Sequence, residues 1–297
     1  MKFRRLNRLI ILLSILILSG STFFFARKDR SSSAELLTRM TLEERYYLDA
    51  FLRNLLFVED FSYVLFGSKP MSFTSYEKYV LPFNVSYDYV SASNLKIKKG
   101  LEVFKKYQHF FSSSNIDMRF FDDPEDLVLV MINKKNFLHV FNKYQSDFKQ
   151  VFGPKINGED YLSQFIGKGD HRENAIKNEA ILGMILGYGK GNALLFHKKR
   201  TLMRELKGFN LSLKQRRSRE EELAEINQHF GRFSLDLPRM KPFPKKLFIP
   251  LPGFVADPDS EETQELKERY GKDRKKMMKI FAKRGFLEAT LHQLMDK

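Results

Sequence analysis

The longest uncharged segment of the chain lies at its start, directly behind a short basic leader. Leu9–Ala26 is predominantly apolar and contains eighteen residues without a charge. As an α-helix it would be about 27 Å long, close to the thickness of the hydrocarbon core of a bilayer. The pattern therefore predicts a transmembrane anchor, preceded by the basic residues Lys2, Arg4, Arg5 and Arg8.

A cleaved signal peptide is the alternative interpretation of the same residues. Its apolar core would be Leu9–Leu18, and the small residues Ser19–Ser21 would precede the cleavage site. Phe23–Phe25 extend the apolar run to the length of a membrane span, which favours the anchor. Under both interpretations residues 1–28 form the leader and residues 29–40 a tether, and the remainder of the chain is exported.

Short apolar runs further along the chain predict a small β-sheet. Met118–Phe121 and Leu127–Ile132 flank an acidic turn, and the continuous apolar run of the second segment predicts a strand buried on both faces. Two further strands are predicted at Tyr63–Phe66 and at the alternating residues Val85, Tyr87 and Tyr89.

Apolar residues spaced three and four apart predict amphipathic helices over most of the remaining chain. Thr41 and Glu44 form a capping box at the start of one helix, and Ser218 and Glu221 form a second box. Ile176–Leu186 is apolar almost all round, which indicates a central, buried helix. One long helix is predicted to bury Phe137, Phe141, Tyr144, Phe148 and Val151, and another is lined by Ile97, Leu101, Phe104 and Phe111.

A proline-rich segment precedes the last predicted helix. Six of the ten prolines lie between Pro238 and Pro258, but the segment also carries many large apolar residues. We therefore expect a strap packed on the body rather than a free linker. Asp257, Asp259 and Ser260 then cap a helix over 260–295, with a kink at Gly271 or Gly285. The patterns together predict a mainly α-helical α+β fold with a small sheet, in one globular domain over 41–297.

An acidic cluster is a candidate for metal binding or acid/base catalysis, but its residues do not have the spacing of a known metal-binding loop. Asp122, Asp123, Glu125 and Asp126 place four carboxylates in five residues. The spacing differs from that of a calcium-binding loop, and no glycine occupies the sharp turn. A solvated hairpin turn is the favoured interpretation.

A glycine-rich segment, GMILGYGKGN over 183–192, also falls short of a known site. A phosphate-binding loop requires Ser or Thr after Gly-Lys and a preceding strand, whereas here Gly191 follows and the preceding segment is helical. We expect Gly183 and Gly187 to permit close approach of a neighbouring helix, and Asn192 to cap the next helix. With no cysteine and no histidine pair at metal-ligand spacing, the sequence assigns no catalytic, cofactor or metal residue.

Charge is more informative than any motif. The chain has a formal net charge of +15, and the excess is concentrated in Lys198–Arg219 and Lys267–Arg284. Such clusters attract the phosphates of nucleic acids or of lipid headgroups, although a solvated basic face needs no partner at all. If the domain is exported, nucleic acid is the less suitable anion. The candidate contact residues are Lys198, Lys199, Arg200, Arg204, Lys207, Arg216, Arg217 and Arg219.

Three stretches carry a resemblance to known sequences: Tyr63–Phe73, Ile181–Lys199 and Leu251–Tyr270. They resemble segments of uncharacterised, N-terminally anchored envelope proteins from chlamydia-related bacteria. The resemblance brings no activity and no catalytic residue. It implies a bacterial inner membrane, with the domain facing the periplasm.

Two hypotheses from different classes follow. The first is a non-enzymatic envelope protein, attached to the inner membrane by Leu9–Ala26 with its domain outside the cytoplasm, whose basic C-terminal half contacts an anionic lipid surface or an acidic envelope protein. After signal cleavage the same domain would be periplasmic or secreted. The alternative is a periplasmic hydrolase that uses carboxylates, with Glu179 and the cluster Asp122–Asp126 as its candidates.

Overall fold

The computed structural model describes residues 33–77, 87–111, 113–122, 126–166, 178–208, 211–229, 231–233 and 249–296. The predicted leader, Leu9–Ala26, lies outside these residues. Within the described ranges, no helix combines the length and the apolar character needed to cross a membrane.

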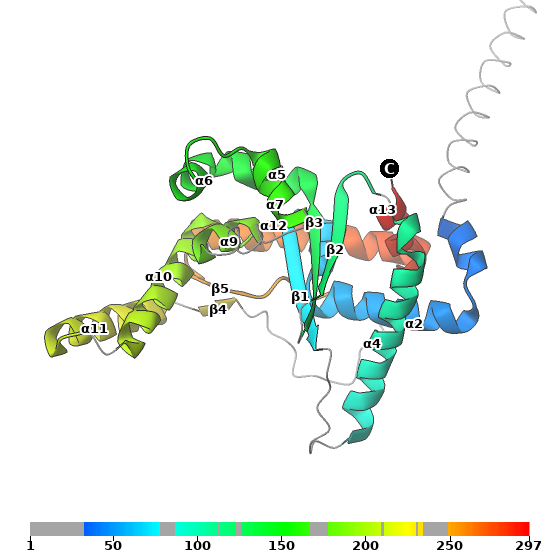
Figure 1. The fold of residues 1–297 in the computed structure, drawn as a ribbon, viewed down its shortest axis with the longest axis horizontal. Coiled ribbons are helices and arrows are strands. Elements are labelled where there is room, and N and C mark those ends of the chain that lie inside the picture. The colour runs from blue at the N-terminus through cyan, green and yellow to red at the C-terminus, as the bar shows by residue number, and fades with distance from the viewer. Residues whose placement is uncertain are drawn as a thin grey trace, which may run out of the picture.

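The described chain is mainly helical, with a three-stranded antiparallel sheet and a two-stranded one (Figure 1). Residues 33–39 are also helical. The helices are α2 (Leu42–Arg53), the π-helical turn η1 (Asn54–Val58), α3 (Phe61–Leu65), α4 (Tyr87–Tyr107), the 3-10 turn η2 (Gln108–Phe110), α5 (Lys134–Lys143), α6 (Gln145–Phe152), α7 (Gly158–Ile166), α9 (Glu179–Ile185), α10 (Lys190–Lys207), α11 (Leu213–His229), α12 (Glu261–Arg284) and α13 (Phe286–Met295). The strands are β1 (Met71–Glu77), β2 (Ile116–Asp122), β3 (Asp126–Asn133), β4 (Gly231–Phe233) and β5 (Phe254–Ala256). The α+β prediction is confirmed at this level.

The main sheet has the strand order β1-β3-β2, and β3 pairs antiparallel with both neighbours. Leu129 and Met131 of β3 pack into one apolar cluster, while Val130 and Ile132 pack into a second cluster on the opposite face. The prediction of a central strand buried on both faces is therefore confirmed, and so is the β2–β3 hairpin around the acidic turn.

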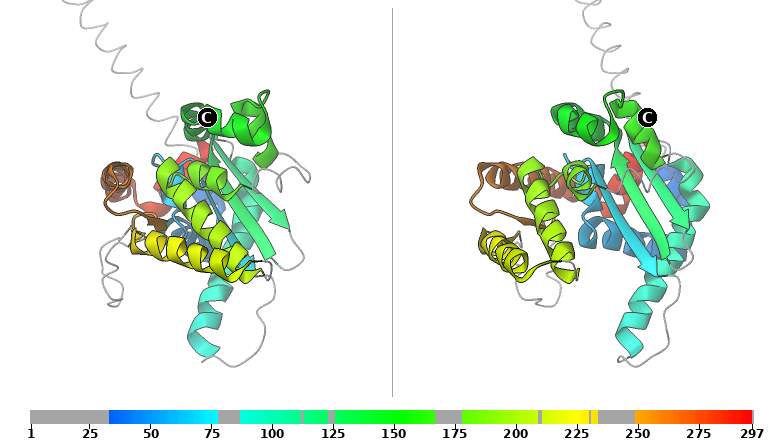
Figure 2. Two further views of the ribbon diagram at one scale, coloured as in Figure 1. Left: turned by 90° about the vertical axis from the view of Figure 1, so that its left-hand side faces the viewer. Right: turned by 60° about the vertical axis from the view of Figure 1, so that its left-hand side comes forward.

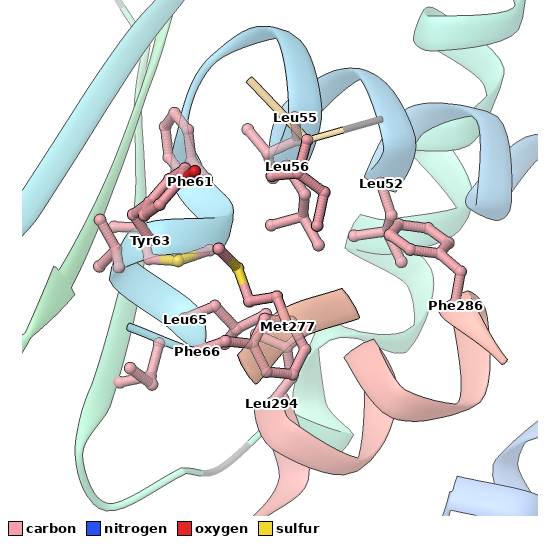
Figure 3. Packing of buried hydrophobic residues seen from close by; sticks show 14 of the residues in the cluster. Leu52, Leu55, Leu56, Phe61, Tyr63, Leu65, Phe66, Met277, Phe286 and Leu294 are labelled. Carbon is pink, nitrogen blue, oxygen red and sulfur yellow. The ribbon is translucent and has the colours of Figure 1, made fainter. Parts of the chain in front are cut away.

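The first cluster joins segments that are far apart in the sequence. Leu52, Leu55 and Leu56 meet Met277 of α12 and Phe286 of α13 (Figure 3). Aromatic edge-to-face contacts are frequent in this cluster and add specificity to the apolar burial.

The second cluster is centred on one tyrosine of α7. The ring of Tyr161 lies within 6.1 Å, between centroids, of five phenylalanine rings. These rings come from α5, α6 and α7, which lie near one end of the strands (Figure 2). The five are Phe137, Phe141, Phe148, Phe152 and Phe165.

Two predicted strands are wrong. Tyr63–Phe66 belongs to helix α3 and its C-terminal cap, and the chain instead forms β1 at Met71–Glu77. A short run in which every residue is apolar fits a buried helix as well as a buried strand. The spacing of its apolar residues therefore could not distinguish the two. Tyr87 and Tyr89 lie in α4, and Val85 is outside the described residues.

Helix α4 contains the predicted apolar residues Ile97, Leu101 and Phe104, and it packs closely on α2. A Cβ at Gly100 would lie 2.2 Å from the backbone oxygen of Tyr47, so only glycine permits this approach. Phe111, predicted on the same helix, follows the turn η2.

The predicted long helix over 137–151 is divided in two. Tyr144 has φ −115° and ψ 27°, which separates α5 from α6. The break lets both helices turn Phe137, Phe141 and Phe148 into the core, while Val151 is 42% exposed.

The two predicted capping boxes have different outcomes. Thr41 and Glu44 form theirs as predicted at the start of α2. Ser218 lies inside α11, so the second box is wrong. The equivalent reciprocal hydrogen bonds form one and a half turns earlier, between Ser212 and Gln215, where Ser-x-x-Gln offers the same chemistry.

The remaining helix boundaries follow the predictions more closely. Ser260 caps α12, which runs through Gly271 and ends at Gly285, with φ 77°. A Cβ at Gly183 would lie 2.8 Å from the Cβ of Ala193, which confirms the close approach of α9 and α10.

The described part of the proline-rich segment is packed on the body. Ile249, Leu251, Phe254 and Ala256 are buried, and Tyr63 donates a hydrogen bond to the Pro250 carbonyl at 2.8 Å. Residues 234–248, including Phe243, lie outside the described residues.

Phe254→Ala is expected to destabilise the protein by about 3–5 kcal/mol, because the ring is buried and stacks on Tyr188 at 4.7 Å. Urea unfolding followed by circular dichroism measures the change. Phe73→Ala is the control, because Phe73 is 46% exposed and its loss should cost far less. Equal stability of wild type and Phe254→Ala would contradict the packed strap.

Candidate functional site

The predicted anion-contact residues lie on α10 and α11, which extend together from one end of the molecule (Figures 1 and 2). Several of these cations join the two helices. Lys198 lies 2.7 Å from Glu222, and Arg219 contacts both Glu205 at 2.9 Å and Glu222 at 3.1 Å. The hydrogen bond from Lys198 lowers the pKa of Glu222. Much of the positive charge of this surface is therefore balanced within the protein.

A second group of these residues converges on helix α9. Arg200 lies 3.5 Å from Glu179, Arg204 is hydrogen-bonded to the same carboxylate, and His197 Nδ1 lies 3.7 Å from it. Glu179, a candidate catalytic residue, thus anchors α10 to the N-terminus of α9.

The other predicted contact residues differ in their surroundings. Arg217 lies 3.4 Å from Glu221 on the exposed side of α11, and Arg216 donates a hydrogen bond to the Gly208 carbonyl at 3.3 Å. Lys199 is half-buried along α10, and Lys207 is exposed in its last turn.

Helix α12 carries a different basic surface. Five exposed lysines at spacings of three and four fall within an arc of about 100° on this helix. Among the described residues, no carboxylate lies within ion-pair distance of the last four, and the first lies 3.8 Å from Glu268. We call this surface the α12 stripe: Lys272, Lys275, Lys276, Lys279 and Lys283.

The amphipathic sequence of α12 explains the position of the stripe. Its inner face buries Tyr270, Met277 and Phe281 in the first cluster, which turns the lysines outward. The acidic residues Glu261 and Glu262 occupy the first turn, and most of the basic residues lie in the second half, with Lys283 and Arg284 in the last turn. This order complements the helix dipole, so it stabilises the helix while concentrating positive charge at one end.

The glycine-rich segment between α9 and α10 has an intramolecular anion. The carboxylate of Glu262 accepts hydrogen bonds from the backbone N–H groups of Lys190 at 2.8 Å and Gly191 at 2.7 Å. A phosphate would need these same donors at the helix N-terminus. Asn192 is not the predicted helix cap. It lies inside α10 and donates to Thr263 Oγ1 at 3.0 Å, because the N-termini of α10 and α12 pack together.

A buried polar cluster lies where α3, β1 and residues 249–253 meet. Lys69 is 2% exposed, and its Nζ lies 3.3 Å from Ser72 Oγ and 5.6 Å from the centroid of the Tyr188 ring. Asp60 has φ 61°, and its carboxylate accepts a hydrogen bond from Gly253 N–H at 3.2 Å. Burial raises the pKa of Asp60 and lowers the pKa of Lys69, while the attraction between the two charges opposes both shifts.

A cavity of about 290 Å³ between α2 and α4 is lined by carboxylates and lysines. Glu44 lies 2.6 Å from Lys106, and Glu43 lies 3.9 Å from Lys99. The hydrogen bond from Lys106 lowers the pKa of Glu44. A general acid requires a raised pKa, so this arrangement favours a structural ion-pair network over acid catalysis.

Two residues of the predicted acidic cluster lie at the ends of the paired strands β2 and β3. Asp122 ends β2 and Asp126 begins β3, while residues 123–125 are outside the described ranges. In the part of the chain that the structure describes, no group of three or more His, Asp or Glu side chains is arranged to hold a metal ion.

Compared with protein-family models, curated protein sequences and solved structures, the chain matches none. The resemblance to envelope proteins of chlamydia-related bacteria therefore stays a prediction.

Sequence reasoning missed Asp60, Lys69 and Glu262, whose roles depend on contacts with distant segments. The α12 stripe did have a signal in the sequence. Within Lys267–Arg284, the spacing of its lysines by three and four residues already places them on one helical face.

Asp60→Asn is expected to raise the melting temperature at neutral pH. The folded-state pKa of Asp60 is raised above 3.8, so ionisation costs stability once the pH exceeds the unfolded-state pKa. The gain should therefore vanish below about pH 4, where both states are protonated. Thermal unfolding between pH 3 and pH 8 measures this difference.

Asp60→Ala is the matched control for the same experiment. It removes the charge, but it also removes the hydrogen bond to Gly253 and the tolerance of Asp and Asn for a left-handed backbone. It should be less stable than Asp60→Asn by about 1–2 kcal/mol. A stabilisation by Asn that is equal at all pH values would contradict the raised pKa.

Proposed function

We propose that this protein is a membrane-anchored, non-enzymatic envelope protein whose basic C-terminal half binds an anionic lipid surface. The observation that carries this proposal is the α12 stripe. It presents five lysines on one helical face. Four of them have no carboxylate partner among the described residues, and one of these four, Lys276, donates a hydrogen bond to the Phe66 carbonyl at 3.3 Å.

The physical argument is electrostatic. Each exposed basic residue close to an anionic bilayer contributes about 1 kcal/mol of binding free energy, and the contribution falls off over about 10 Å at ordinary ionic strength. The stripe therefore has to lie flat on the surface to be effective. Its lysines satisfy this requirement because they lie on one side of a single helix, opposite its buried residues.

Helices α10 and α11 form a second, weaker candidate surface. Lys198, Arg200, Arg204 and Arg219 already pair with carboxylates, so their attraction for lipid phosphates is reduced. Lys207 is the best placed of the original candidates, since it is exposed at the end of α10.

The anchor is the second part of the proposal. Leu9–Ala26 would span the inner membrane once and place the folded residues outside the cytoplasm. Only six residues separate Ala26 from Ser33, and six residues span at most about 22 Å. Such a short connection would hold the domain close to the bilayer, where the α12 stripe would reach the headgroups.

The rival hydrolase hypothesis receives less support. Its candidate Glu179 is engaged by two arginines, and the carboxylates of the cavity beside α4 are paired with lysines. A carboxylate-dependent hydrolase needs two carboxylates that share a substrate cleft and have different pKa values.

Replacement of Lys272, Lys275, Lys279 and Lys283 by Gln should weaken binding to anionic liposomes at least about tenfold. The chain from Ser31 onward is used, so that the leader does not dominate binding. Co-sedimentation with phosphatidylglycerol-containing and pure phosphatidylcholine liposomes, at low and high salt, measures the effect. Wild type should bind only the anionic vesicles, and salt should release it.

The matched control replaces four cations of the other surface, Lys198, Lys199, Arg200 and Arg204, by Gln. It changes the net charge equally and should reduce binding less, because several of these cations are already paired. Equal losses in both variants would indicate a general charge effect. Binding to neutral vesicles as strong as to anionic ones would contradict the proposal.

The full chain should remain with membranes through alkaline carbonate washing, whereas the chain from Ser31 should be released, because Leu9–Ala26 is long enough to span a bilayer. Immunoblotting of the pellet and supernatant measures the distribution. Intact-mass analysis that finds a mature N-terminus at Thr22 would replace the anchor by a cleaved signal.

A further inference from the structure

A groove without an assigned role runs beside the outer strand of the main sheet. Its volume is about 520 Å³, within the range of about 300–1,000 Å³ that is typical of ligand clefts. The C-terminal part of α4, the turn η2, strand β2 and the end of α13 surround it. Its lining residues are Phe104, Lys105, Gln108, His109, Phe111, Ile116, Met118, Arg119, Phe120 and Leu294.

Strand β2 has a free edge on this side of the sheet, because β3 is its only strand neighbour in the described chain. Asn133 of β3 donates its N–H to the Pro70 carbonyl, on the β1 side. Asn133 therefore exchanges no backbone hydrogen bonds with Ile116, the residue opposite it on β2.

In an antiparallel pair of strands, residues alternate between those that hydrogen-bond to the partner strand and those whose backbone groups point away from it. The same reasoning therefore applies to every second residue of β2. If Ile116 points its N–H and C=O away from β3, then so do Met118 and Phe120. The Ile116 N–H is satisfied by Ser113 Oγ at 3.2 Å. Within the described residues, no group accepts from or donates to the outward backbone groups of Met118 and Phe120.

The side chains of these same three residues line the groove. They alternate with Asp117 and Arg119, and Arg119 also borders the groove. The Phe120 ring lies 5.8 Å from Phe104, and Phe104 lies 4.7 Å from Phe111, so the base of the groove is aromatic. An added strand would hydrogen-bond to β2 and place alternate side chains over this base.

The charge beside the groove is positive. Lys105 Nζ lies 5.4 Å from the centroid of the Phe120 ring, and no described carboxylate lies within ion-pair distance of it. Arg119 is bound to Asp117 at 2.6 Å, which largely neutralises it. One lysine is therefore available to a negative group on a ligand.

We propose that this groove binds an extended peptide segment of another protein by strand addition to β2. The segment carries apolar side chains at alternate positions and an acidic residue next to Lys105. A fatty-acid-like amphiphile would also match the aromatic base and Lys105. It would leave the backbone groups of Met118 and Phe120 without partners, whereas a peptide strand satisfies them. This inference is independent of the α12 stripe.

The test selects peptides from a random heptapeptide display library on the full chain in phosphatidylcholine nanodiscs. The enriched peptides are synthesised, and their affinities are measured by fluorescence anisotropy. We expect enriched sequences with alternating apolar positions and at least one acidic residue. Lys105→Gln should raise the Kd severalfold and reduce its dependence on salt.

Met118→Pro provides the decisive variant. Proline removes the outward N–H and leaves the hydrogen bonds to β3 in place, since Met118 makes none of them. It should raise the Kd at least tenfold. Met118→Val is the matched control, because it shortens the same side chain but keeps the N–H, and its Kd should stay within about threefold of wild type.

Hydrogen exchange gives a second measurement that needs no variant. In wild type, the bound peptide should slow exchange of the Met118 and Phe120 amides, and the inward amides of β2 should change less. The proposal is overturned if no peptide is enriched, if Met118→Pro binds as tightly as Met118→Val, or if these amides stay unprotected. Binding of dodecanoate without any enriched peptide would also overturn it and assign the groove to amphiphiles.

Discussion

The rest of the structure depends on the burial of β3 on both faces. Leu129 and Met131 face one apolar cluster, and Val130 and Ile132 face the other, so helices must cover the strand from two sides. The helices that do so come from the N-terminal, middle and C-terminal parts of the described chain. A chain without cysteine has no disulfide to join such distant segments, and apolar burial has to do so.

This constraint also decides which charges remain available for partners. Where helices pack against one another near their ends, carboxylates bind groups of the protein itself. Glu262 accepts hydrogen bonds at the N-terminus of α10, and Glu179 forms ion pairs with Arg200 and Arg204. Helix α12 instead packs its apolar face into the first cluster, and its lysines face outward. Basic residues therefore have a different electrostatic effect on α12 than on α10 and α11.

A central β3 has a further consequence for the sheet. Among the described residues this sheet has three strands, so both neighbours of β3 are edge strands. Edge strands usually need protection from pairing with other chains. On β2 the unprotected backbone lies beside an apolar groove and a lysine, and the proposed binding of an extended peptide rests on this combination.

Local patterns in the sequence determined the α+β class, the β2–β3 hairpin, the Thr41 capping box and the start of α12 at Ser260. Each depends on residues close together in the chain, where hydrogen-bond geometry and side-chain period act directly. The tertiary structure alone decided that Tyr63–Leu65 is helical, that the helix after β3 breaks at Tyr144, and which cations are paired. Those outcomes depend on contacts between residues far apart in the chain, such as Glu262 with Lys190. The spacing of apolar and polar residues within one segment carries no information about such contacts.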